Sequence, residues 1–384
     1  MIPYSRQSIN KKDLKSVLSA LKSDLVTTGP KIEEFEKAIR KIVKAKYAIA
    51  VNSATSALHL SCISLNLKPN DWLWTSPNSF VASANCGLYC GAKIDFVDID
   101  PKTYNICTEN LIKKLKIAKI QKKLPKIIVT VSFAGQACDQ SEIKKLSKIY
   151  KFKIVEDSSH ALGAKYKKEP LGNCKYTDIS VFSFHPVKII TTLEGGIAVT
   201  NNKKIYQKLK MLRAHGITRD KSLLKNPSNA HWYYEQQFLG YNYRMNDIEA
   251  ALGISQLTRL NQFIKKRLKI KKFYDKKLKN LPIILPTIKK ENISSMHLYV
   301  INLNKNYTKN KRDNVIKFLR NNGIGANVHY IPIHYQPYFK KLGFKKGMFP
   351  NCESYYERAI SLPIHSMLKK KDLIKIVNLL KSIF

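Results

Sequence analysis

The sequence predicts an α/β protein built on a mainly parallel sheet, with a smaller α+β domain towards its C-terminal end. Over about the first 200 residues, short apolar runs alternate with helical patterns, which is typical of parallel strands joined by helices. From about residue 247 the pattern changes to a long helix that runs into a lysine-rich stretch. A chain of 384 residues also exceeds the usual size of one compact domain. We therefore expect a large domain over 13–255 and a small domain over 256–384 that also includes residues 1–12.

Seven apolar segments are the candidate strands of the sheet. Helical patterns fall between many of them, and a helix on the crossover connection is what a parallel pair of strands requires. The candidate strands are 47–52, 72–75, 94–97, 126–132, 152–156, 179–184 and 196–200. The candidate helices are 55–65, 79–90, 109–118 and 141–150.

The charge balance is strongly basic, with 68 Lys and Arg against 27 Asp and Glu, a formal net charge of +41. Such a charge favours polyanions, so a nucleic-acid partner has to be considered. The excess is mostly lysine, spread from Lys11 to Lys381, and aromatic residues do not interleave with it as a stacking platform requires. We expect no nucleic-acid partner, and a positive field that helps to recruit an anionic small substrate.

Composition also bears on membranes, location and metals. No apolar run reaches the length of a membrane span, and the first residues lack the apolar core of a signal peptide, so we expect no membrane partner and a cytoplasmic protein. The seven cysteines are scattered and include no CxxC pair. We therefore expect buried free thiols and no metal site.

The end of the first candidate strand offers a phosphate seat. In an open parallel sheet, ligands bind beyond the carboxyl ends of the strands. Strand 47–52 continues into small residues, among them Ala54 and Thr55, that open a helix. Free N–H groups and the positive dipole end make a helix N-terminus suitable for a phosphate. A plain helix cap explains the segment equally well, since it needs only one hydroxyl.

Asp157 and His160 follow candidate strand 152–156. A carboxylate just past an apolar strand is costly unless a cationic group meets it. A protonated pyridine nitrogen is such a group, and holding its proton makes the ring an electron sink. His160 could reach another substituent of the same ring. The alternative is a helix-capping aspartate beside a surface histidine.

Lys188 follows candidate strand 179–184 in an apolar setting. Burial lowers the pKa of a lysine, and the neutral amine forms imines with carbonyl compounds. Most lysines are solvated charges, but Asp157 stands 31 residues earlier at another strand end, which favours a catalytic Lys188. Ser183 could add a phosphate contact. Phe80, after strand 72–75, could stack on a flat cofactor or pack in the core.

Together these motifs resemble the DegT/DnrJ/EryC1/StrS family of sugar aminotransferases. The strings that carry the likeness are NSATSALHL, EDSSHALGA and SFHPVK-x-ITT-x-EGG. The likeness extends from Leu25–Pro30 through Arg213–Gly216 and Gly240–Met245 to Val328–His334, which is almost the whole chain. The family implies the fold type I architecture of aminotransferases that use pyridoxal 5'-phosphate. It also implies a homodimer whose active sites lie at the subunit interface.

The resemblance also implies roles for individual residues. Lys188 would form the Schiff base with pyridoxal phosphate and then move the proton between the donor carbon and the cofactor. Asp157 would pair with the pyridinium nitrogen, His160 would contact the ring hydroxyl, and Phe80 would stack on the ring. The phosphate would be held by Ala54, Thr55 and Ser183 of the same chain, and by Asn242 of the partner subunit. The nucleotide sugar would be contacted by Tyr4, Arg6, His329 and Tyr330.

Within the family, the closest likeness is to the branch that acts in pseudaminic acid synthesis. That branch aminates C4 of a UDP-linked 4-keto-6-deoxy-N-acetylhexosamine, with glutamate as the expected donor. Other keto nucleotide sugars of the same family, and lyase or aldolase chemistry on the same fold, are alternatives. A catalytically idle protein with a binding or regulatory role would lack Lys188 or Asp157, and both are present. Dehydratase members replace the lysine by histidine, so Lys188 disfavours that branch.

Overall fold

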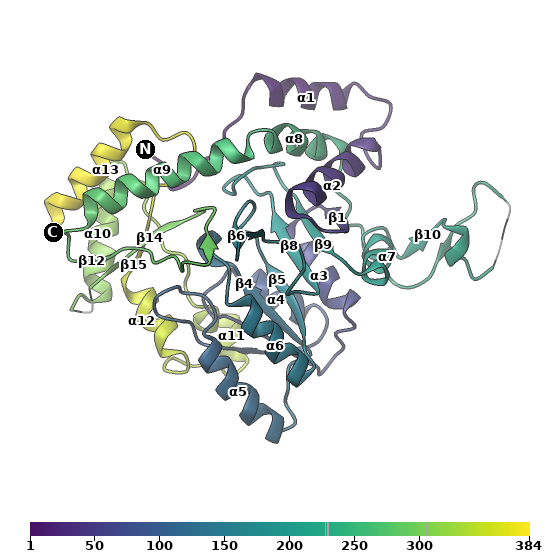
Figure 1. Cartoon of the computed structure of the whole chain (residues 1–384), viewed down its shortest axis with the longest axis horizontal. Coiled ribbons are helices and arrows are strands. Elements are labelled where there is room, and N and C mark those ends of the chain that lie inside the picture. Colours follow the sequence, from purple (N-terminus) through teal and green to yellow (C-terminus); the bar gives the residue numbers. More distant parts are fainter. Residues whose placement is uncertain (227, 229, 305) are drawn as a thin grey trace.

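The computed structural model describes residues 1–226, 228, 230–304 and 306–384. Its centre is a seven-stranded sheet (Figure 1). The strands are β1 (Tyr47–Val51), β2 (Trp72–Thr75), β3 (Lys93–Phe96), β4 (Ile127–Val131), β5 (Lys153–Asp157), β8 (Ile179–Ser183) and β9 (Gly196–Thr200). Their order across the sheet is β1-β9-β8-β5-β4-β2-β3. The structure confirms the predicted α/β class, and each predicted strand lies within one residue of its observed bounds.

Five strands of this sheet, β3, β2, β4, β5 and β8, run parallel, whereas β9 is antiparallel to both of its neighbours, β8 and β1. The reason lies in the connection between β8 and β9. Residues 184–195 contain no helix, and a parallel crossover needs a long connection that usually carries one. The chain therefore turns back on itself, and this turn carries Lys188. The sheet is mainly parallel, as predicted.

Both faces of the sheet are covered by helices, which is why its strands are apolar at successive positions. Ile128 and Ile154 face a cluster formed with α5 and α6, whereas their neighbours Val129 and Val155 face a cluster formed with α3 and α4. The helices of this part are α1 (Lys11–Leu21), α2 (Pro30–Val43), α3 (Ala54–Ser64), α4 (Ala82–Leu88), α5 (Thr108–Ile120), α6 (Gln140–Tyr150), α7 (Lys203–Leu212) and α8 (Asp247–Leu257). Helix α4 begins later than predicted, so Phe80 stands in the loop that precedes it.

The C-terminal part has a smaller antiparallel sheet, in which β14 (Tyr299–Leu303) lies between β12 (Ile283–Ile284) and β15 (Ala359–Leu362). Its apolar core is formed with α9 (Leu260–Leu278), α10 (Lys309–Asn321) and α13 (Lys370–Ile383). Helix α9 joins the two parts, because Phe263 packs in the core of the large sheet and Tyr274 in the core of the small one. The proposed division at residue 255 stays a prediction.

The remaining elements are short. A hairpin of β10 (Ile217–Thr218) and β11 (Glu235–Gln236) projects from the body of the molecule beyond α7 (Figure 1). The others are β6 (Lys165–Tyr166), β7 (Glu169–Pro170), β13 (Asn292–Ile293), α11 (Pro337–Lys341), α12 (Pro350–Arg358), and the 3-10 turns η1 (Phe133–Gly135), η2 (Lys221–Leu223) and η3 (Ile333–Tyr335). In the described part of the chain, no helix combines the length and apolar character needed to cross a membrane. The seven cysteines are free thiols, four of them buried.

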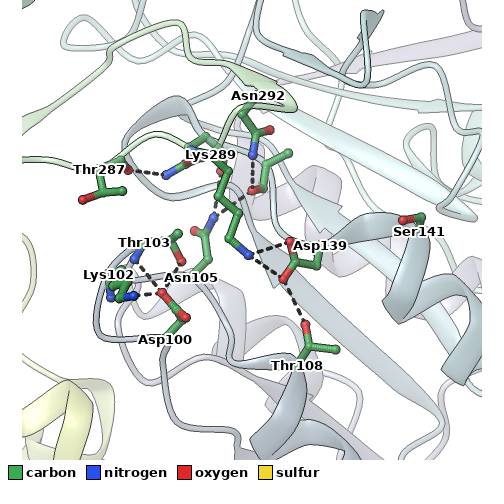
Figure 2. A network of polar contacts seen from close by, with 12 residues as sticks. Asp100, Lys102, Thr103, Asn105, Thr108, Asp139, Ser141, Thr287, Lys289 and Asn292 are labelled. Atoms are coloured by element: carbon green, nitrogen blue, oxygen red, sulfur yellow. Dashed lines mark hydrogen bonds and ion pairs between the residues drawn. The ribbon is translucent and has the colours of Figure 1, made fainter.

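A polar network ties the segment before β13 to the large sheet (Figure 2). The Nζ atom of Lys289 lies 2.9 and 2.8 Å from the two carboxylate oxygens of Asp139, which also accepts a hydrogen bond from Thr108. Asn105 donates to the carbonyls of Gln136 and Ala137 and accepts from the amide of Phe133. The loop after β4 is therefore fixed from several sides, and this loop borders the site described next.

Candidate functional site

A cavity of about 520 Å³ lies at the carboxyl ends of β5 and β8, beside the start of α3. Groups from the large sheet line it together with groups from the C-terminal part and from the N-terminal segment. Ten of the twelve residues predicted from the sequence line this one cavity: Tyr4, Ala54, Thr55, Phe80, Asp157, His160, Ser183, Lys188, His329 and Tyr330. Residues at strand ends that are far apart in the sequence therefore meet at the carboxyl edge of the sheet, as expected for parallel strands.

Asp157 is the last residue of β5 and is buried, with 6% of its surface exposed. One carboxylate oxygen accepts a 2.6 Å hydrogen bond from the hydroxyl of Ser83, and the other accepts a 3.1 Å bond from the amide of Ser159. These bonds fix the direction in which the carboxylate faces the cavity. No ion pair of the described residues includes Asp157. The arrangement suits a cationic N–H group of a ligand.

Lys188 lies in the turn between β8 and β9, where its amide donates to the carbonyl of His185. The residues that follow it, Ile189 and Ile190, are buried. Burial lowers the pKa of the Lys188 amine to about 8, and the charge of Asp157 opposes part of that shift. The neutral, nucleophilic fraction of the amine close to neutral pH is therefore much larger than that of a lysine with an ordinary pKa.

The first turn of α3 forms a cradle for an anion. Ser53 caps the helix by accepting a 3.1 Å hydrogen bond from the amide of Ser56. The amides of Ala54 and Thr55 precede the first possible helical hydrogen bond, so they are free to donate to a ligand. Gly196 passes so close that a Cβ atom there would lie 2.4 Å from the Ala54 nitrogen. A glycine is thus required at the start of β9, and the cradle fits a phosphate group.

His160 is held in one tautomer. Its Nδ1 atom accepts from the amide of Ala134 at 3.3 Å, so the proton is on Nε2, which lies 3.1 Å from the hydroxyl of Tyr330. Burial, and then the charge of Lys188, lowers the pKa of His160 well below its ordinary value. Burial also raises the pKa of the Tyr330 hydroxyl. The pair is therefore neutral and offers fixed polar groups to a ligand ring.

His329 stands on the side of the cavity formed by the C-terminal part. Its Nδ1 atom lies 2.8 Å from the hydroxyl of Ser361, and its ring centre lies 5.1 Å from that of Tyr4. Burial, and then the charge of Lys188, lowers the pKa of His329 to about 3. This histidine is neutral at any pH near 7, so it can serve as a hydrogen-bonding group and carries no charge.

The structure adds a histidine that the sequence reasoning missed. His297 lines the cavity with 2% of its surface exposed, and its ring centre is 4.3 Å from that of His160. Its Nδ1 atom has no hydrogen-bond partner among the described residues. The sequence signal was a histidine before the apolar run that forms β14, but only the packing of the two parts brings it to the cavity. The other unpredicted polar residues that line the cavity are Ser53, Ser79, Ser159, His185, Glu194 and Asn327.

Two predicted residues do not line this cavity. Arg6 and Asn242 are exposed. The backbone of Asn242 bridges that of Ala214, next to the projecting β10–β11 hairpin. The single chain therefore leaves both predicted contacts untested, and the role of Asn242 across a subunit interface stays a prediction.

Comparisons with known proteins agree with this geometry. The model of the DegT/DnrJ/EryC1/StrS aminotransferase family matches residues 7–381. The chain is 39% identical to a Campylobacter jejuni protein named UDP-4-amino-4,6-dideoxy-N-acetyl-beta-L-altrosamine transaminase, over 97% of this chain and 94% of the relative. It superimposes with a TM-score of 0.90 and 32% identity on Helicobacter pylori PseC, described as an aminotransferase of pseudoaminic acid biosynthesis, covering 100% and 99% of the two chains. A Streptococcus pneumoniae sugar aminotransferase in its PLP form gives a TM-score of 0.89 at 29% identity, covering 100% and 98%.

Proposed function

We propose two substrates for this chain, which belongs to the DegT/DnrJ/EryC1/StrS aminotransferase family and is a pyridoxal-phosphate-dependent sugar aminotransferase. The amino acceptor would be C4 of a UDP-linked 4-keto-6-deoxy-N-acetylhexosamine, and the amino donor would be glutamate. The observation that supports the chemistry best is the pairing of Lys188 and Asp157 in one cavity. Lys188 supplies an amine whose pKa burial lowers to about 8, and Asp157 supplies a fixed, buried carboxylate. The acceptor rests on the names of the relatives.

The cavity offers a carboxylate, an imidazole and an anion-binding helix N-terminus, and each of them would hold a different part of the cofactor. Asp157 would hold the proton on the ring nitrogen, and His160 would face the ring hydroxyl. Phe80, 60% exposed in this structure, would be covered by the stacked ring. The phosphate would lie against Ala54, Thr55 and Ser183 at the helix N-terminus. Bound there, pyridoxal phosphate supplies a carbonyl that carries the amino group and a ring that withdraws electrons.

Lys188 would act twice in each half-reaction. Its neutral amine would hold the cofactor through the carbonyl carbon, with loss of water, and the amine freed by the amino donor would move the proton between the donor carbon and the cofactor. A pKa of about 8 suits both tasks, since the amine can gain and lose a proton near neutral pH. The neutral His160 and His329 beside it leave that proton on the lysine, because their own pKa values are far lower.

The sugar would bind in the same cavity as the cofactor. Tyr4, His329 and Tyr330 line the cavity and offer hydroxyl and imidazole groups to a keto sugar. Arg6 follows Tyr4 by two residues and is exposed, and its guanidinium group would bind the diphosphate. The net charge of +41 favours the approach of such an anionic substrate.

A homodimer would complete the site. Asn242 is exposed and carries a side-chain amide that could donate to a phosphate. We assign Asn242 of the partner subunit to the cofactor phosphate, so that each active site uses two chains.

The first experiment is the visible spectrum of the purified protein with pyridoxal phosphate, before and after addition of glutamate. Conversion of the visible band to the shorter-wavelength pyridoxamine form would support the donor half-reaction. Mass spectrometry of the product from the UDP-linked 4-keto sugar would then test the acceptor. Conversion by another amino acid alone would overturn the donor, and amination of a 3-keto sugar alone would overturn the acceptor.

A further inference from the structure

Residues 2–5, called here the N-terminal strap, are seated in the C-terminal part of the molecule. The amide of Ile2 donates to the carbonyl of Gly323, and the carbonyl of Ile2 accepts from the amide of Gly325, both at 2.7 Å. The carbonyl of Tyr4 accepts from the amide of Ile364 at 3.0 Å. Figure 1 accordingly shows the N-terminus beside α9 and α13, next to the C-terminal part of the chain.

The strap also reaches the turn that carries the lysine. The hydroxyl of Ser5 donates to the carbonyl of Val187 at 2.8 Å, and Ser5 is 8% exposed. Val187 immediately precedes Lys188, so this bond acts on the backbone of the lysine turn. Tyr4, the neighbour of Ser5, lines the same cavity as Lys188, and burial raises its pKa, so its phenol stays neutral.

The seat of the strap is closely fitted. A Cβ atom on Gly325 would lie 3.0 Å from the carbonyl oxygen of Ile2 and 3.1 Å from the Cα of Pro3 and the nitrogen of Tyr4. These are backbone atoms, which cannot swing away as a flexible side chain can. A side chain at position 325 would therefore displace the strap by a few tenths of an ångström, and Ser5 with it.

We propose that Ser5 is a positioning residue for Lys188, and that the strap fixes the lysine turn and keeps water from its amine. Lys188 is otherwise held in a turn of irregular backbone, so an anchor from another part of the chain restricts where its amine can lie. The proposal rests on the assignment of Lys188 as the catalytic amine. It acts through the backbone of Val187, so Ser5 itself touches no reacting atom.

The test is the reactivity of Lys188 in the cofactor-free protein, measured as the pH dependence of its labelling by an amine reagent and read by mass spectrometry. In Ser5→Ala the amine gains water and its pKa rises, so labelling at pH 8 should slow roughly two- to fivefold. The half-reaction with glutamate should slow by a similar factor with little change in KM. Ser5→Thr keeps the hydroxyl and should restore both. Gly325→Ala, which displaces the strap, should act in the same direction as Ser5→Ala.

Ser16→Ala is the matched control, because the Ser16 hydroxyl also donates to a large-domain carbonyl, that of Ala251, at 2.9 Å. It should leave the labelling of Lys188 unchanged. Equal labelling in Ser5→Ala and Ser16→Ala would overturn the proposal. Labelling needs neither cofactor nor sugar, so a wrong acceptor would leave this result intact. If Lys188 is labelled as expected but the protein shows no visible absorption band with pyridoxal phosphate, that result would instead count against the proposed function.

Discussion

The environment of Lys188 costs the folded protein stability. Burial lowers its pKa to about 8, against about 10.4 in an unfolded chain. Below pH 8 the folded state must hold a poorly solvated charge, and this cost disappears as the pH rises from 8 through 10.4. We therefore expect Lys188→Met to raise the free energy of unfolding of the cofactor-free protein by about 1–3 kcal/mol at pH 7.

Denaturant unfolding at pH 7 and pH 10.5 measures this gain, which should shrink at the higher pH. The exposed Lys371→Met is the control and should change stability by less than about 0.5 kcal/mol at either pH. A Lys188→Met protein no more stable than the control would show that the amine is not desolvated. The same variant should have lost its turnover with glutamate.

Asp157 should govern rate more than binding. In Asp157→Asn the one remaining side-chain oxygen can still accept a hydrogen bond from Ser83 or from Ser159, but the ring nitrogen loses its anionic partner. The glutamate half-reaction should slow roughly 10²-fold or more. Stopped-flow spectroscopy measures it, with Ser83→Ala as a milder comparison that keeps the charge. A rate within twofold of the unmodified protein would contradict the assigned role of Asp157.

The strand ends explain why these two residues could be predicted and Ser83 could not. Asp157 and Lys188 stand directly after apolar runs, and parallel strands bring such positions to one edge of a sheet. Ser83 lies inside α4, in a run of small residues with no signal of its own. His297 was missed for a different reason, since its place depends on how the two parts of the chain pack.

At the scale of elements, the start of α3 depends on Gly196. A Cβ atom there would press on the backbone of Ser53 and Ala54 and turn the first N–H groups of α3 out of the cradle. Gly196→Ala should weaken the binding of pyridoxal phosphate roughly tenfold or more, the worth of one good hydrogen bond, and cost about 1–3 kcal/mol of stability.

Titration of the cofactor by fluorescence measures that affinity. Ile197→Val, one residue along β9 and packed in a different core from α3, is the control. It should cost about 0.5–1.5 kcal/mol of stability and leave affinity unchanged. If the two variants bind pyridoxal phosphate with equal affinity, the assignment of the cofactor phosphate to the start of α3 is wrong.

The strands were predictable because each is a short apolar run between turn residues. The direction of β9 was not part of the prediction, although a signal existed: 184–195 is too short and too irregular for a helical crossover. The late start of α4 could not be predicted, because the bonds that hold 77–80 as a loop come from distant residues. Asn78, for example, donates to the carbonyl of Tyr104.

At the scale of the whole molecule, a shared active site makes a quantitative prediction. Lys188→Ala removes one group and Asn242→Ala removes the other, which we assign to the opposite chain. Exchange of subunits between the two variants should restore activity to about a quarter of the unmodified level, because half of the dimers then carry one intact site. Activity after mixing, with each variant alone as control, measures this. If subunits are shown to exchange and the mixture gains no activity, then Asn242 acts in the active site of its own chain or in neither active site.

The seat of the N-terminal strap has a consequence for the order of synthesis. Ile2 and Tyr4 bond to residues 323–325 and 364, which leave the ribosome more than 300 residues after the strap. The strap must therefore wait, unpaired, until nearly the whole chain has been made, while the large sheet can already form. Ribosome-bound chains halted before residue 320 should thus have a folded sheet and a lysine turn still open to water. The cofactor would then find its finished site only on the completed protein.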